Sequence, residues 1–142
     1  MRKASVKKTA PSATWSDVAG DVEIYAVSTE AQRDVLVNVM HAGRGEWGPR
    51  DHYERVRKKS YSLELVTGGS GVMDINGTRH ILGPGDLVLM HPDDYCHYWT
   101  GPEGVWRKLF ISIHPGTLLA VVHHLRLDKI WHVRLTRANA RR

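Results

Sequence analysis

The segment from Leu63 to Tyr98 consists of short apolar runs separated by glycine-rich turns, and this pattern constrains the fold more than any other feature of the chain. The turns are Gly68-Gly69-Ser70-Gly71, Asn76-Gly77 and Gly83-Pro84-Gly85-Asp86. Each run is too short for an independent helix and is rich in Val, Ile and Leu, and Asn-Gly between apolar runs is a strong signal for a two-residue hairpin turn. We therefore expect a mainly β fold, a small barrel whose interior can hold a ligand.

The size of the chain indicates one domain. Its 142 residues are enough to bury roughly two thirds of the unfolded surface, so neither disulfides nor a metal is needed for stability. Cys96 is the single cysteine, which is typical of a reducing compartment. No apolar run approaches the roughly 18 residues that span a bilayer, and no apolar signal core follows the basic start. The sequence predicts a soluble, cytoplasmic protein that does not enter the membrane.

The net charge of +5 is concentrated at the two ends of the chain. Residues 1–14 carry four basic residues and no acidic one, and residues 134–142 carry four arginines and no acidic residue. The body between them holds 12 basic and 15 acidic residues. A basic end of this kind is typical of a flexible arm, so we expect residues 1–14 to be such an arm rather than a nucleic-acid reader.

Strand signals also occur before and after the central segment. Val22–Val27 and Val35–Met40 are rich in β-forming residues, whereas residues 41–51 contain three glycines and a proline and predict a loop, in which Trp47 is a candidate lid. Residues 105–114 form the last clear strand. One face of it carries Trp106, Lys108, Phe110 and Ser112, and the other is nearly all aliphatic and should pack against another element.

A short amphipathic helix is expected after Pro115-Gly116, where the apolar period changes from two to about 3.6 residues. Thr117 is a plausible N-cap. The apolar stripe consists of Leu118, Val121, Val122 and Leu125. It would either dock on the barrel or seat the helix of a twofold partner, so these four residues are the candidates for dimerisation.

Several motifs stand in the order and spacing of one known module. They are Tyr53-x3-Arg57, Tyr61-x-Leu63-x-Leu65-Val66, Gly69-x-Gly71, Leu82-Gly83-Pro84-Gly85-Asp86-Leu87-x-Leu89, Pro92, His97-Tyr98, Trp106, Phe110 and Leu118-Leu119. In these motifs the chain resembles the N-terminal cupin-like ligand-binding and dimerisation domain of AraC-type transcription regulators, over about residues 40 to 127. The resemblance implies a jelly-roll barrel, the double-stranded β-helix of cupins, that holds a small effector, often a sugar, with helices that pair two subunits.

The resemblance also implies a DNA-reading unit of two helix-turn-helix motifs after the sensor domain. Residues 130–142 leave no room for even one such pair of helices. We therefore expect a basic arm at residues 1–14, a barrel at 15–115, and an amphipathic helix with a basic tail at 116–142. DNA would be contacted only through a domain that is missing from this chain.

Enzymatic cupins resemble the chain in fold but bind a metal through histidines and a glutamate. Counting back from Gly71, the glutamate place falls on Glu64, but the two histidine places fall on basic residues or a serine within 57–60. A cationic side chain cannot bind a metal ion and would repel it. The later motif is irregular, and only His97 fits there, with an insertion. We expect no metal, no other cofactor and no catalysis.

The candidate ligand-binding residues combine aromatic rings with polar groups, as the recognition of a polyol requires. They are Tyr98, Lys108, Phe110, Trp106, His97 and Glu64. The resemblance places Tyr98, Lys108 and Phe110 at effector-contacting positions. Lys108 would either reach water or meet an anion or hydroxyl inside the barrel. The alternative for Trp106 is a plain core residue, and the alternative for Glu64 is a surface residue paired with the basic cluster at 57–59. We favour these alternatives for both residues.

Together these features predict the small-molecule sensing and dimerisation domain of an AraC-type regulator, forming a homodimer and binding an effector, such as a sugar, without chemistry. Two alternatives remain open at this point. One is a stand-alone small cupin enzyme of the isomerase or dioxygenase type, and the other is a dimerisation module without a ligand.

Overall fold

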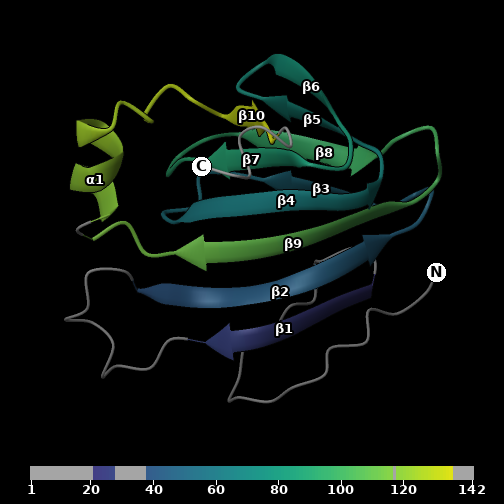
Figure 1. The fold of residues 1–142 in the computed structure, drawn as a ribbon, viewed down its shortest axis with the longest axis horizontal. Helices are drawn as coiled ribbons and strands as arrows, with labels where there is room; N and C mark the ends of the chain where they lie inside the picture. Colours follow the sequence, from purple (N-terminus) through teal and green to yellow (C-terminus); the bar gives the residue numbers. More distant parts are fainter. Residues whose placement is uncertain (1–20, 28–37, 117, 136–142) are drawn as a thin grey trace.

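The computed structural model describes residues 21–27, 38–116 and 118–135, with only the backbone given for residues 21–27. Two antiparallel sheets face each other and form a barrel (Figure 1). The six-stranded sheet has the order β1-β2-β9-β4-β7-β10, and the four-stranded sheet has the order β3-β8-β5-β6. The predicted mainly β cupin barrel is confirmed.

The strands of the six-stranded sheet are β1 (Asp21–Val27), β2 (Val39–Trp47), β4 (Tyr61–Gly69), β7 (Asp86–Met90), β9 (Trp106–Ile113) and β10 (His132–Arg134). Those of the four-stranded sheet are β3 (His52–Arg55), β5 (Gly71–Ile75), β6 (Thr78–Leu82) and β8 (Cys96–Thr100). The single helix of the described residues is α1 (Leu118–His124). It lies beyond the end of β9 in Figure 1.

The turn between β5 and β6 is the predicted two-residue hairpin. Ile75 pairs with Thr78, and the residues between them, Asn76 and Gly77, have φ angles of 48° and 85°. Positive φ at both central residues is the requirement of a type I′ turn, which Asn-Gly meets at low cost. The pattern of apolar runs therefore sets the strand register of this hairpin.

The prediction of a loop at residues 41–51 is wrong for residues 41–47, which form most of β2. Two glycines lead to this error, because glycine in a sequence usually indicates a turn. In the structure Gly43 and Gly45 are buried and pair with Phe110 and Lys108 of β9. A glycine inside a strand is compatible with pairing of this kind, although it weakens the strand signal in the sequence. Of the predicted strand at Val35–Met40, residues 35–37 lie outside the described residues, and Val39 and Met40 belong to β2.

Two apolar clusters hold the barrel together. The larger fills the space between the sheets with Trp47, Val66, Met73, Ile75, Leu82, Val88, Met90, Cys96, Tyr98 and Trp106. The smaller one lies where Tyr61, Ile113 and Val122 pack together, joined by Leu118 and Ile111. The aliphatic face predicted for the last strand thus packs against α1 at its Ile111 and Ile113 end, while Leu109 remains exposed.

Residues after α1 return to the barrel, although the sequence indicated only a basic tail from residue 134. Strand β10 pairs with β7, and Arg134 donates two hydrogen bonds of 2.8 Å to the carboxylate of Asp86. Asp86 is fully buried and also accepts a hydrogen bond from the Gly83 amide. These bonds, those from Arg134 above all, hold the pKa of the Asp86 carboxyl well below its usual range. Charge counting along the chain could not find this partner, because it lies 48 residues away.

Candidate functional site

The interior of the barrel contains a buried ion pair. The ammonium group of Lys108 on β9 donates a hydrogen bond of 2.7 Å to the carboxylate of Glu64 on β4. Both residues are almost completely buried, at 4% and 5% exposure. In the antiparallel register Lys108 pairs with Val66 and Glu64 with Phe110, so the two charged residues are diagonal neighbours on the inner face.

Three aromatic rings surround the Lys108 ammonium. Its nitrogen lies 4.0 Å from the ring centre of Trp47 and 4.3 Å from those of Tyr98 and Trp106. Trp47 is stacked on Tyr98 at 5.4 Å and meets Trp106 edge to face at 5.5 Å. An ammonium ion over aromatic faces is attracted by their quadrupoles. We call Trp47, Glu64, Tyr98, Trp106 and Lys108 the lumen cluster.

Burial dominates the electrostatics of this cluster. It lowers the pKa of the Lys108 ammonium, and the neighbouring Glu64 carboxylate opposes that shift. It also raises the pKa of the Tyr98 phenol well above its usual range, so the phenol stays protonated at neutral pH. The cluster therefore offers a cation, an anion and a neutral hydroxyl within an apolar enclosure, where polar contacts are stronger than in water.

The structure brings together four of the six residues predicted as ligand-binding. Tyr98, Lys108, Trp106 and Glu64 belong to the lumen cluster. Phe110 faces the same interior, is half-buried and meets the ring of His41 at 6.1 Å. The anion expected near Lys108 is Glu64, so the interpretation of Glu64 as a surface residue paired with residues 57–59 is wrong. Its partner is 44 residues distant, which no local pattern reveals.

His97 lies on the opposite face of β8 from Tyr98, since buried and half-buried residues alternate along this strand. Adjacent residues of a strand point to opposite faces, so His97 and Tyr98 cannot both face the interior. His97 is therefore not part of the lumen cluster, and its role in ligand binding stays a prediction. Trp47, considered only as a lid, is in fact a core residue of the lumen cluster with 2% exposure. The alternation Gly43-x-Gly45-x-Trp47 was the signal that could have revealed it.

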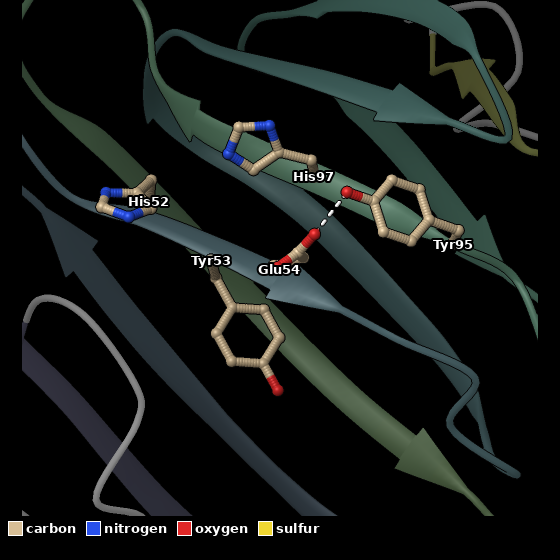
Figure 2. Close-up of a pocket in the computed structure, with 5 residues that line it drawn as sticks. All are labelled: His52, Tyr53, Glu54, Tyr95 and His97. Atoms are coloured by element: carbon tan, nitrogen blue, oxygen red, sulfur yellow. Dashed lines mark hydrogen bonds between the residues drawn. The ribbon is translucent and has the colours of Figure 1, made fainter.

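His97 instead lines an open cleft of about 520 Å³ on the outer surface of the four-stranded sheet, together with His52, Tyr53, Glu54 and Tyr95 (Figure 2). The Tyr95 hydroxyl donates a hydrogen bond to Glu54. The ring of Tyr53 points away from this surface in Figure 2 and contacts Tyr98 at 5.5 Å. The cleft therefore lies outside the barrel wall, separated from the lumen cluster by the sheet.

The residues of the chain do not fit the metal site of enzymatic cupins. Glu64 is bound by Lys108 inside the barrel, and His97 points outward, so these two candidates do not converge. Within residues 38–116 and 118–135, no group of three His, Cys, Asp or Glu side chains could hold a metal ion. Cys96 is buried, and burial raises the pKa of its thiol to about 12, as expected for a small core residue rather than a nucleophile.

The predicted helix stripe is divided between two environments. Val122 is buried and Leu118 packs beside it on the barrel, whereas Val121 and Leu125 are 40% and 59% exposed. Leu119 is also exposed. The helix thus docks on its own barrel with one side and leaves the other side open. Thr117, the predicted N-cap, lies outside the described residues.

A family model described as the AraC-like ligand binding domain matches residues 41–129 of the chain. The chain belongs to this family. This AraC-like domain is 33% identical over 58 residues to the arabinose operon regulatory protein of Salmonella typhimurium, a match that covers 40% of the chain and 21% of that relative. The chain thus spans about a fifth of the length of the regulator that it matches.

Solved structures similar to this AraC-like domain share its cupin fold. A protein described as a predicted oxalate decarboxylase from Thermotoga maritima has a TM-score of 0.55 at 18% identity, covering 67% of the chain and 82% of that structure. A cupin domain of an XRE-family transcriptional regulator from Enterobacter cloacae has a TM-score of 0.53 at 17% identity, covering 68% and 96%. At these identities the likeness concerns the fold alone.

Proposed function

We propose that the chain is the effector-sensing domain of an AraC-type transcription regulator and binds a small polar molecule inside the barrel without chemical conversion. The observation that carries this proposal is the lumen cluster, a buried Lys108–Glu64 pair enclosed by three aromatic rings. Such a mixture of ring faces and fixed hydrogen-bonding groups is typical of small-molecule sites. A sugar or a related polyol suits it, because its C–H faces stack on rings while its hydroxyls bond to the charged groups.

The effector would act through a binding equilibrium. A ligand shifts a conformational equilibrium only by as much as it binds one state better than the other. Lys108 lies on β9, the strand that leads directly into α1, so repositioning of the lysine by a ligand would reach the helix through a short path. The arm at residues 1–14 lies outside the described residues, and its proposed role is to respond to the effector as a second coupled element.

Dimer formation is the second part of the proposal. Val121 of α1 and Leu125, just after its end, are exposed members of the predicted stripe. Residues four apart lie on the same side of a helix, and exposed apolar residues placed in this way suit pairing with a second copy of the same helix about a twofold axis. DNA would be contacted by a unit other than this barrel, and the protein would work in the cytoplasm. Among residues 21–27, 38–116 and 118–135, no helix has the length and apolar character needed to cross a membrane.

A ligand screen tests the sensing role. Pentoses, hexoses, uronic acids and small aromatics are added to the purified chain, and the thermal midpoint is measured for each. A ligand at a hundred times its dissociation constant adds about 2.7 kcal/mol to the free energy of unfolding, which raises the midpoint by several degrees. The same shift should be lost in Lys108→Met and kept in Arg107→Met, since Arg107 is exposed on the outer side of the same strand.

Two outcomes would contradict this function. If no compound in the screen stabilises the chain, a dimerisation module without a ligand is the better description. If the purified protein contains stoichiometric iron, manganese, nickel or zinc, and removal of the metal changes its stability, the stand-alone enzyme must be considered instead.

A further inference from the structure

Several buried hydrogen-bonding groups near the lumen cluster have no partner in the structure. The indole nitrogens of Trp47 and Trp106 and the hydroxyls of Ser70 and Thr100 are such groups among the described residues. All four side chains are more than nine-tenths buried, with Trp106 at 0% and Trp47 at 2% exposure. Folded proteins pair most buried polar groups, and each unpaired one is costly, so four in one region call for a guest that pairs with them.

These four groups gather at one end of the barrel. Trp47 pairs with Trp106 across β2 and β9. A methyl group placed on Gly71 would contact the Trp106 ring at 2.3 Å, and Gly71 pairs with Thr100. A methyl group on Gly101 would in turn meet the Ser70 hydroxyl at 2.4 Å. One region of the barrel is therefore surrounded by the C-terminal ends of β2, β4 and β8 and by the N-terminal ends of β5 and β9.

Two of the four unpaired groups can only donate a hydrogen bond, and the other two are hydroxyls that can donate or accept. An indole N–H can only donate a hydrogen bond, and an ammonium group has three donors and no acceptor. Of the three donors on Lys108, one is used by Glu64 in the described structure. The negative charge of Glu64 is already compensated by Lys108, so it does not dominate the electrostatic potential at the position of a guest. A guest must consequently present several acceptor oxygens, and a carboxylate offers the most of them in the smallest volume.

We propose that the effector carries a carboxylate group, whose oxygens accept hydrogen bonds from the indole N–H groups of Trp47 and Trp106 beside the Lys108 ammonium. This inference rests on the proposed sensing function and narrows it to acidic effectors such as sugar acids, hydroxy acids or aromatic acids. Trp47 and Trp106 are then the residues that distinguish an acid from its neutral analogue. Ser70 and Thr100, which both donate and accept, would bond to the remaining polar groups of the guest.

Matched pairs of probes test this inference by calorimetry. They are glucuronate with glucose, galacturonate with galactose, lactate with propane-1,2-diol, and benzoate with benzyl alcohol. We expect at least one acid to bind at least about tenfold more tightly than its neutral analogue, the difference that one hydrogen bond to a charged group provides. Trp47→Phe and Trp106→Phe keep an aromatic ring but remove the N–H, so each should reduce the ratio of acid affinity to neutral affinity by about tenfold. Trp99→Phe is the control, because Trp99 lies on the outer face of β8 against His97.

The indole N–H resonances of the wild-type chain provide a readout that does not depend on the folding of a variant. Each of the five tryptophans contributes one indole N–H signal in a nitrogen-labelled sample. The bound acid should move those of Trp47 and Trp106 and leave that of Trp99 in place. Neutral members that bind as tightly as the acids would overturn the carboxylate inference and leave the sensing function intact. If every acid fails to bind and a neutral compound from the wider screen does bind, the carboxylate inference is likewise overturned and the sensing function is kept. If no compound binds, the carboxylate inference and the sensing function are both overturned.

Discussion

Removing the charge of Lys108 should destabilise the fold strongly. Lys108→Met keeps most of the side-chain volume but leaves the Glu64 carboxylate buried without its hydrogen-bond donor at 2.7 Å. Breaking a buried ion pair by removing one partner costs about 3–5 kcal/mol, because the remaining charge is neither solvated nor paired. The loss of three cation–π contacts acts in the same direction.

The free energy of unfolding, measured by urea titration with far-UV circular dichroism, checks this magnitude. Arg107→Met is the matched control, since Arg107 is the next residue of β9 and pairs with Glu46 at 2.8 Å on the exposed outer face. An exposed pair contributes about 1 kcal/mol at most. If Lys108→Met were within about 1 kcal/mol of Arg107→Met, the buried pair would not have the energetic role assigned to it.

Three further outcomes are expected. The pKa of the Asp86 carboxyl is lowered by its hydrogen bonds to Arg134. Its contribution to stability should therefore be present above about pH 4 and be lost as the pH falls further. Asp86→Asn should remove that pH dependence and lower the free energy of unfolding by about 2 kcal/mol at pH 7, as measured by urea titration. Because burial raises the thiol pKa to about 12, Cys96 should resist a thiol reagent at pH 8 until urea unfolds the chain, and rapid labelling of the native protein would contradict this. Gly71→Ala should lower the free energy of unfolding by about 3 kcal/mol, because its methyl group would lie 2.3 Å from the Trp106 ring. Gly77→Ala should lower it by only about 1 kcal/mol, because Gly77 has open space around it and a φ of 85°. Equal thermal midpoints of the two variants would refute this comparison.

Much of the fold follows from local patterns in the sequence. The Asn76-Gly77 turn and the alternation along residues 106–112 are both visible without a structure, and both are confirmed. Alternation predicted that Trp106 and Lys108 share a face, which is the inner one. Period-two patterns are reliable here because one face of each sheet is buried, so a shift by one residue would expose the core.

The errors come from contacts between distant parts of the chain. Glycines at 43 and 45 predict a loop from the local sequence, because their pairing with Phe110 and Lys108 involves a strand that lies more than 60 residues away. The surface interpretation of Glu64 pairs it with the nearby basic residues 57–59, whereas its actual partner, Lys108, lies 44 residues away in the sequence. Alternation along a strand predicts that His97 and its neighbour Tyr98 point to opposite faces, so only one of them can face the lumen.

A double variant of the buried Lys108–Glu64 pair can distinguish a role of the pair in stability from a role in ligand binding. Replacing a buried ion pair with apolar residues of similar volume is often neutral or stabilising, so Glu64→Leu combined with Lys108→Met should recover most of the stability lost in Lys108→Met alone. A pair that served folding only would thus be replaceable without loss. If the pair serves to hold a guest, the double variant should fold as well as the wild-type chain and no longer be stabilised by the compounds of the screen, because the charged groups that contact the guest are gone. A double variant that folds and still binds the same compound with unchanged affinity would place the binding site elsewhere, with the outer cleft around His97 as the next region to examine.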